Sequence, residues 1–169
     1  MKKYLTLLFL SVMLGVGLVS CEGDDPITYR YTLENQSGVS ITLKPFFYDD
    51  TGRTIPRKEI ILRNEQKIEK KEKMYAPSLD YNFVDFFETR EEGRINKLEV
   101  VYDNKKKKVF LLQRGSEKGK GRCETEFGVE VPCDSRNILN INIYRNVTEH
   151  YIFTAEDYQQ AEDCKGDCE

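Results

Sequence analysis

The stretch Tyr29-Arg-Tyr-Thr-Leu33-Glu-Asn-Gln-Ser-Gly38-Val-Ser-Ile-Thr-Leu43 carries the pattern that decides the fold. Apolar and polar residues alternate on both sides of a polar turn that ends at Gly38. A period of two is typical of a β-strand with one buried face. The sequence therefore predicts two strands here, joined as a hairpin.

The same pattern of short apolar segments and turn residues continues toward the C-terminus. Further strands are predicted at residues 59–63, 66–75, 81–89, 97–102, 107–113, 138–144 and 150–153. Such a series is typical of an all-β fold, and we expect an antiparallel β-sandwich or an irregular barrel. One short C-terminal helix is predicted at residues 154–162, because Thr154 can cap it and Glu156 and Asp157 lie in its first turn.

The N-terminus has the features of a signal peptide at residues 1–20. Lys2 and Lys3 precede an apolar run at residues 5–19 that is short for a membrane span. The stretch Leu18-Val19-Ser20-Cys21 resembles the lipobox of bacterial lipoproteins. This resemblance implies that Cys21 is acylated and holds the protein on a lipid bilayer. We therefore expect a lipidated tether at residues 21–28 and a single β-rich domain at residues 29–169.

The segment Tyr151-Ile-Phe-Thr-Ala-Glu-Asp-Tyr-Gln-Gln-Ala161 resembles the C-terminal segment of small uncharacterised lipoproteins of Bacteroidota. The resemblance implies an outer-membrane lipoprotein. The acidic tether 22–25 resembles the signal that sends such lipoproteins to the cell surface, although a solvated linker would have the same composition.

The charge of the chain argues against a nucleic-acid partner. The full sequence has a net charge of −3. Removal of Lys2 and Lys3 with the signal peptide leaves 24 basic and 29 acidic residues, a net charge of −5. A protein that binds nucleic acid normally presents a basic surface to the phosphates.

Four cysteines remain once Cys21 is assigned to the lipid. An even number of cysteines in an oxidising compartment predicts two disulfides. We expect Cys123 with Cys133 and Cys164 with Cys168, because each pair is close in sequence. The crossed pairings between residues 123 or 133 and the tail remain open.

The residues that could carry catalysis are few. His150 is the only histidine, and the chain contains no Gly-x-Ser-x-Gly motif. Several carboxylates lie near the aromatic residues of segment 81–87. These carboxylates are Asp80, Asp85, Glu88, Glu91 and Glu92. A strand followed by a charged loop explains them equally well, so we expect neither an enzyme nor a cofactor.

Two charged regions have alternative interpretations. The acidic tail at residues 162–169 has oxygen atoms for a metal ion, but its spacing matches no metal motif, and a disulfide-closed terminus is the simpler interpretation, so we expect no metal. Lysines 67, 70, 71 and 73, on the polar side of one predicted strand, and lysines 105–108 could meet an anionic glycan. They could equally protect a strand edge from mispairing.

The segment 114–137 is predicted to be a long loop stapled by Cys123 and Cys133. Long loops in compact domains are commonly functional, so this loop is the expected contact surface, and a purely structural loop stapled by the disulfide is the equally open alternative. The candidate binding residues are Lys118, Lys120, Arg122, Glu124, Glu126 and Phe127. The sequence thus predicts a lipoprotein with a binding role, with an envelope protein or a glycan as partner. An immunity or inhibitor lipoprotein that neutralises a toxin is the alternative.

Overall fold

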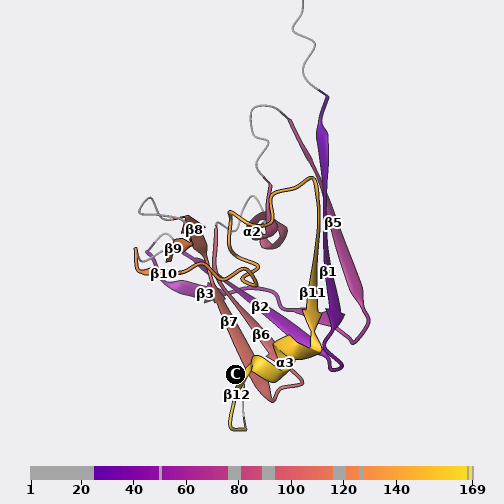
Figure 1. The fold of residues 1–169 in the computed structure, drawn as a ribbon, viewed down its shortest axis with the longest axis vertical. Helices are drawn as coiled ribbons and strands as arrows, with labels where there is room; N and C mark the ends of the chain where they lie inside the picture. Colours follow the sequence, from indigo (N-terminus) through magenta and orange to yellow (C-terminus); the bar gives the residue numbers. More distant parts are fainter. Residues whose placement is uncertain are drawn as a thin grey trace, which may run out of the picture.

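The computed structural model describes residues 25–49, 51–75, 81–88, 94–115, 121–125, 128–166 and 168. This part of the chain forms three open β-sheets and two short helices (Figure 1). The all-β prediction is confirmed in its sandwich form, because the strands do not close into a barrel. The predicted signal peptide and Cys21 lie outside the described residues.

Sheet A has the strand order β11-β1-β5. Its strands are β1 (Ile27–Gln36), β5 (Lys67–Met74) and β11 (Thr148–Thr154). β1 pairs antiparallel with β5 and parallel with β11. Alternate residues of β1, from Tyr29 through Tyr31 to Leu33, are buried, as the pattern predicts. β1 begins at Ile27, two residues before the predicted start of the domain.

Sheet B has the order β12-β7-β6-β2-β3, and β4 also pairs with β2. Its strands are β2 (Ile41–Tyr48), β3 (Thr54–Pro56), β4 (Ile60–Leu62), β6 (Ile95–Tyr102), β7 (Lys106–Leu111) and β12 (Glu162–Asp163). All its pairings are antiparallel. The predicted strands 59–63, 97–102 and 107–113 therefore lie in this sheet, although the last of them ends at Leu111.

The predicted hairpin between β1 and β2 is wrong, because the two strands belong to different sheets. The turn between them is a corner held by Asn35. The Asn35 side-chain amide donates to the carbonyl oxygens of Val39 (2.7 Å) and Leu62 (2.9 Å). Its Oδ1 accepts a hydrogen bond from the Ser37 amide at 3.0 Å. The alternation correctly predicted the burial of the apolar residues of both strands, but it did not predict the burial of Glu34 and Asn35 and carried no information about the partner strand.

The predicted strand 81–89 is also wrong, because it contains the helix α2 (Phe83–Phe87). Phe83, Phe86 and Phe87 are buried together, and their spacing of three and four residues is helical. The C-terminal helix α3 (Ala155–Gln160) forms as predicted, with Thr154 as its cap. The described residues therefore contain one helix, α2, that the sequence did not predict.

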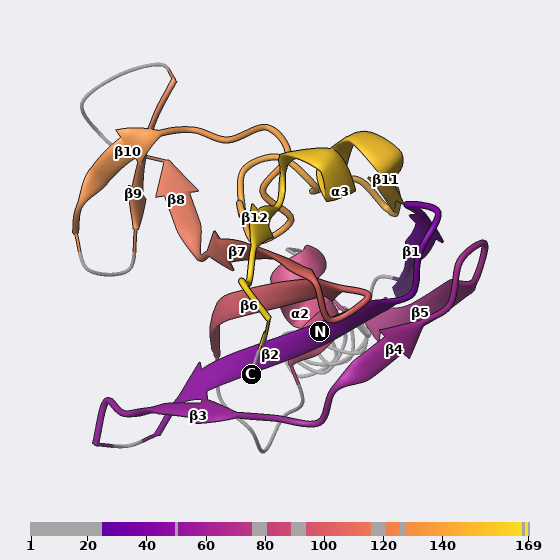
Figure 2. The same cartoon turned by 90° about the horizontal axis from the view of Figure 1, so that it is seen from below.

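The described residues of the expected long loop 114–137 include most of the small antiparallel sheet C. Its strands are β8 (Gln113–Gly115), β9 (Arg122–Thr125) and β10 (Glu130–Pro132). Sheet C lies on the opposite side of the molecule from sheet A (Figures 1 and 2). Cys123 and Cys133 are joined, with their Cα atoms 4.9 Å apart.

The predicted strand 138–144 is wrong, because this segment forms turns with a single bridge to Gln113. Two asparagines explain the difference. The side-chain oxygen of Asn137 accepts from the Leu139 amide, and that of Asn140 accepts from the Asn142 amide. Such bonds give the backbone an alternative to a strand ladder.

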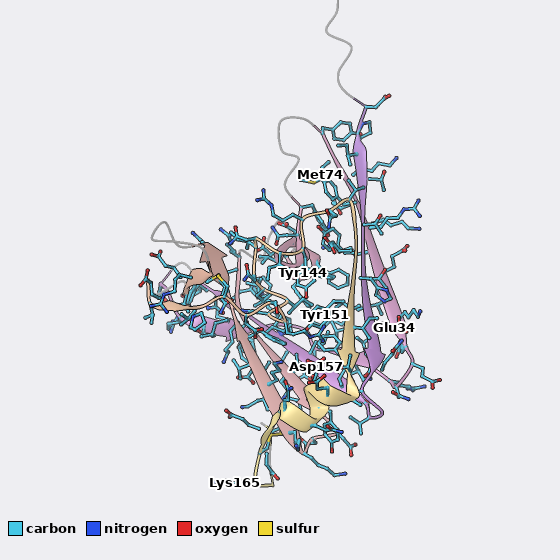
Figure 3. The ribbon with its side chains drawn as sticks, viewed as in Figure 1. Glu34, Met74, Tyr144, Tyr151, Asp157 and Lys165 are labelled. Carbon is cyan, nitrogen blue, oxygen red and sulfur yellow. A yellow bond between two sulfur atoms is a disulfide. The ribbon has the colours of Figure 1, made fainter. Side chains whose placement is uncertain are left out.

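Edge-to-face aromatic pairs link sheet A to α2. The Tyr31 ring lies 4.8 Å from the rings of both Tyr81 and Phe83, and Phe83 lies 5.2 Å from Tyr144. The Tyr31 hydroxyl donates to the Tyr81 carbonyl at 2.7 Å. Figure 3 shows Tyr144 and Tyr151 on the inner side of sheet A. These contacts fix α2 relative to sheet A.

Candidate functional site

The helix α2 begins at a capping box that the sequence analysis missed. The Asn82 side chain accepts a hydrogen bond from the Val84 amide at 2.9 Å, and the Asp85 side chain accepts one from the Asn82 amide at 2.8 Å. Together these bonds satisfy two backbone donors at the helix start. The signal was present in the sequence as Asn82-x-x-Asp85 in front of helically spaced phenylalanines.

Lys70 holds the other end of α2. Its ammonium group donates to the carbonyl oxygens of Asp85 (2.9 Å), Phe86 (3.1 Å) and Glu88 (3.1 Å). A cation at this place also complements the negative end of the helix. Lys70 therefore fixes the backbone that carries Asp85 and Glu88.

A cleft of about 450 Å³ lies beside α2. We call it the α2 cleft. Its lining residues come from α2 and its flanks, from the start of β6 and from the turns before β11. They are Asn82, Asp85, Glu88, Arg94, Ile141, Asn142 and Arg145. All but Ile141 are polar or charged, so the α2 cleft presents hydrogen-bond donors and acceptors from three separate segments.

The two carboxyl groups of the α2 cleft are perturbed by burial. Burial raises the pKa of Glu88 to about 7, and the hydrogen bond from the Ile95 amide to Glu88 (3.0 Å) and the charge of Arg94 only partly oppose this. Burial also raises the pKa of Asp85. Glu88 can therefore donate or accept a proton near neutral pH, a property found often in binding and catalytic sites.

The structure brings together only part of the carboxylate cluster seen in the sequence. Asp85 and Glu88 both line the α2 cleft. Asp80, Glu91 and Glu92 lie outside the described residues. The interpretation of Asp85 and Glu88 as part of a strand with alternating faces is wrong, since Asp85 belongs to α2 and Glu88 follows it.

Two candidate binding residues of segment 114–137 are described by the structure, and neither lines the α2 cleft. Arg122 and Glu124 lie on β9, where Arg122 is exposed and Glu124 is partly buried. Lys118, Lys120, Glu126 and Phe127 lie outside the described residues.

His150 is exposed on β11, as expected for a surface strand residue. Its Nε2 lies 2.8 Å from the Glu34 carboxylate, which also accepts a hydrogen bond from Gln36 and pairs with Lys67 at 2.9 Å. The hydrogen bonds from Gln36 and Lys67 lower the pKa of Glu34. This cluster joins the three strands of sheet A on its outer face, and we assign it a structural role.

The lysines of β5 divide between two faces. β5 is an edge strand of sheet A. Lys67, Lys71 and Lys73 are exposed on its outer face, which agrees with protection of an edge. The sequence analysis placed Lys70 with them, but it lies at an odd spacing from the other three and points inward to α2.

The lysine run that ends at Lys108 is held by the C-terminal part of the chain. The Lys106 ammonium donates to the Gln159 carbonyl at 3.0 Å, and the Lys108 ammonium lies 3.5 Å from Asp157. These lysines therefore take part in structural contacts.

The tail is closed by a disulfide between Cys164 and Cys168, whose Cα atoms lie 5.2 Å apart. Both predicted local disulfides are thus confirmed. Asp163 accepts a hydrogen bond from the Lys165 amide at 2.8 Å. Within the described ranges, no three histidine, cysteine or acidic side chains are grouped closely enough to hold a metal ion.

Comparison of the chain with protein-family models, curated proteins and solved structures found no match. Neither α2 nor α3, the helices of the described part of the chain, is long and apolar enough to cross a membrane.

Proposed function

We propose that this chain is a lipid-anchored envelope lipoprotein that binds a polar ligand in the α2 cleft. The observation that carries the binding role is the convergence of Asp85, Glu88, Arg94 and Asn142 on one hollow. The anchor rests on the likeness of residues 18–21 to a lipobox. Acylated Cys21 would hold the domain on the outer membrane, within reach of glycans and envelope proteins.

A hydroxyl-rich ligand of the glycan type suits the α2 cleft best. Carboxylates accept hydrogen bonds, guanidinium groups donate them, and asparagine does both. A sugar hydroxyl needs both kinds of partner. Among the described lining residues Ile141 alone is apolar, so a purely apolar ligand would leave many polar groups without partners.

Titration with soluble glycan fragments, followed by calorimetry and by NMR shifts, tests this proposal. We expect binding by the wild type and at least tenfold weaker binding by Asn142→Ala, which removes a side chain that both donates and accepts. Asn64→Ala is the matched control, because it removes the same side chain in a turn outside the α2 cleft. Equal weakening in the two variants would contradict the assignment of the α2 cleft.

Mass spectrometry of the membrane fraction tests the anchor separately. We expect a mature N-terminus at acylated Cys21, and we expect Cys21→Ala to lose both lipidation and cleavage. Proteinase added to intact cells tests the cell-surface location, and replacement of Glu22, Asp24 and Asp25 by alanine should then protect the domain inside the cell. Retention of the Cys21→Ala protein in the membrane after cleavage would contradict the anchor.

The alternative, an inhibitor or immunity lipoprotein, is favoured by sheet C. Its hairpin is stapled by Cys123 and Cys133 and exposes the apolar side chain of Val129, which is 56% accessible. A pair of strands stapled by a disulfide suits a protein partner, because the staple reduces the conformational entropy that binding would otherwise remove. Capture of a toxin from native envelopes by the wild type, but not by Val129→Asp, would support this alternative.

A further inference from the structure

The ends of β1 and β5 nearest residue 27 extend beyond β11. Ile27 pairs with Met74 and Tyr29 with Glu72, whereas the pairing of β1 with β11 begins only at Arg30. Figure 1 shows these two strands running on past the end of β11. We call this end of the two strands, residues 27–30 and 71–74, the β1–β5 ribbon.

The outer face of the β1–β5 ribbon is basic. Arg30 lies directly opposite Lys71, and Thr28 lies opposite Lys73. All three basic side chains are exposed. Like charges placed opposite one another destabilise a sheet. Glu69 lies 2.9 Å from Lys71, and the charge of Arg30 also acts on Glu69, so this carboxylate offsets part of the positive charge of the three basic side chains. This arrangement gives the β1–β5 ribbon a positive surface on a chain whose net charge is negative.

The tip of the β1–β5 ribbon is apolar and aromatic. Ile27 and Met74 form its last pair, and Tyr75, which follows, is 60% exposed. Figure 3 shows Met74 at this end of sheet A. Exposed tyrosine beside lysine and arginine is typical of protein surfaces at the membrane–water interface, where the ring enters the headgroup layer and the cations meet phosphates.

We propose that the β1–β5 ribbon rests on the anionic phospholipid headgroups of the bilayer that holds the chain. This inference rests on the proposed lipid anchor at Cys21. Only residues 22–26 separate that cysteine from β1, and five residues reach at most about 18 Å. The anchor therefore brings the positive face close to the membrane. The contact would hold the domain in one orientation, with sheet A nearest the bilayer.

Flotation with lipid vesicles tests the contact without the acyl chains. The protein is the chain from residue 21 onward, carrying Cys21→Ser and keeping the tether with its acidic residues. The vesicles contain phosphatidylglycerol mixed with phosphatidylcholine, or phosphatidylcholine alone. We expect binding to the anionic vesicles, weakened as salt is added, and at least about tenfold weaker binding to the neutral vesicles.

The decisive variant combines Arg30→Gln, Lys71→Gln and Lys73→Gln. The matched control combines Lys58→Gln, Arg63→Gln and Lys105→Gln, which removes the same charges outside the β1–β5 ribbon. We expect the first variant to lose anionic-vesicle binding about tenfold or more and the control to keep it, with circular dichroism showing both folded.

Equal losses in the two variants would overturn the proposal, as would wild-type binding that ignores vesicle charge. Failure of the glycan titration or of the acylation experiment leaves this result intact, because neither the α2 cleft nor an acyl chain takes part in flotation.

Discussion

The helices α2 and α3 begin with the same local motif but place its carboxylate in different electrostatic surroundings. In α2, Asp85 accepts a hydrogen bond from the Asn82 amide, and in α3, Asp157 accepts one from the Thr154 amide. Burial raises the pKa of Asp85. Burial acts to raise the pKa of Asp157 too, but hydrogen bonds from Thr154 and Arg136 hold it below the ordinary value.

The difference lies in the cations that face each carboxylate. Asp157 bonds to the Arg136 guanidinium and has the Lys108 ammonium 3.5 Å away. In α2, Lys70 gives its hydrogen bonds to backbone carbonyls instead. The Asp157 carboxylate is therefore paired with cations of the fold, whereas the carboxyl groups of Asp85 and Glu88 can still form hydrogen bonds with a ligand.

The largest expected effect belongs to Asp157→Asn. This change keeps the shape of a side chain that is only 4% exposed but leaves Arg136 and Lys108 without their counter-charge. We expect the free energy of unfolding, measured with urea, to fall by about 3 kcal/mol. Glu156→Gln, at an exposed position of the same helix turn, should change it by less than about 0.5 kcal/mol. Similar losses of unfolding free energy in Asp157→Asn and Glu156→Gln would contradict the special role assigned to Asp157.

The second largest effect is expected from Lys70→Met, which should lower the free energy of unfolding by about 2 kcal/mol. The change keeps much of the side-chain volume but removes the donor that three carbonyl groups at the end of α2 share. Lys71→Met, one residue along and on the opposite face of β5, removes only an exposed ion pair and should cost about 0.5 kcal/mol or less. Urea unfolding of the two variants measures both effects. A smaller loss for Lys70→Met than for Lys71→Met would contradict the role assigned to Lys70.

The free energy of unfolding should depend on pH through the titration of Glu88. Its pKa is about 7 in the folded protein against 4.5 in a free side chain, so the folded state holds the proton more tightly. The contribution of Glu88 to the free energy of unfolding is therefore greatest below about pH 4.5 and falls as the pH rises toward 7. We expect a fall of about 1–2 kcal/mol, reduced from the full shift because the cleft is open to solvent.

Glu88→Gln should flatten this part of the profile, since glutamine imitates the protonated form. The control is Glu99→Gln on β6, a carboxylate paired with Lys97 at 2.9 Å. A profile that stays as steep in Glu88→Gln as in the wild type would show that other groups cause the slope.

The smallest effect is expected from Asp85→Asn, the same substitution as at Asp157 and at the same helix position. The asparagine oxygen can still accept the hydrogen bond from the Asn82 amide, and the change removes a charge that burial opposes. We expect less than about 1 kcal/mol of change in the free energy of unfolding. A loss equal to that of Asp157→Asn would mean that both carboxylates serve the fold alike.

Local patterns in the sequence predicted the burial of β1 and β2, the helix α3 and both short-range disulfides. Each of these depends on residues close in the chain, such as the Thr154 cap or the separation of Cys164 from Cys168. The strand partners could not be predicted in this way. The turn after Asn35 has the composition of a hairpin, yet long-range bonds such as that to the Leu62 carbonyl make it a corner.

The sequence pointed to some of the residues that line the α2 cleft, but not to all of them. Asp85 and Glu88 stood out as carboxylates beside aromatic residues, but their burial depends on contacts far along the chain. Asn142 and Arg145 join them only because the turns before β11 fold against α2. The inward direction of Lys70 follows from the period of two along β5, which separates it from Lys67, Lys71 and Lys73.

The parallel pairing of β1 with β11 ties folding to the completion of the chain. Arg30 lies beside Thr148 in this pairing, and Gln36 lies beside Thr154, so contacts in sheet A span well over a hundred residues. Closing so large a loop is entropically costly, and folds that depend on distant contacts form slowly. A chain made from its N-terminus onward therefore has β1 ready long before its second neighbour exists. Until β11 has been synthesised, one edge of β1 has no partner strand. Chaperones and proteases that act on newly made protein can recognise the chain during that time.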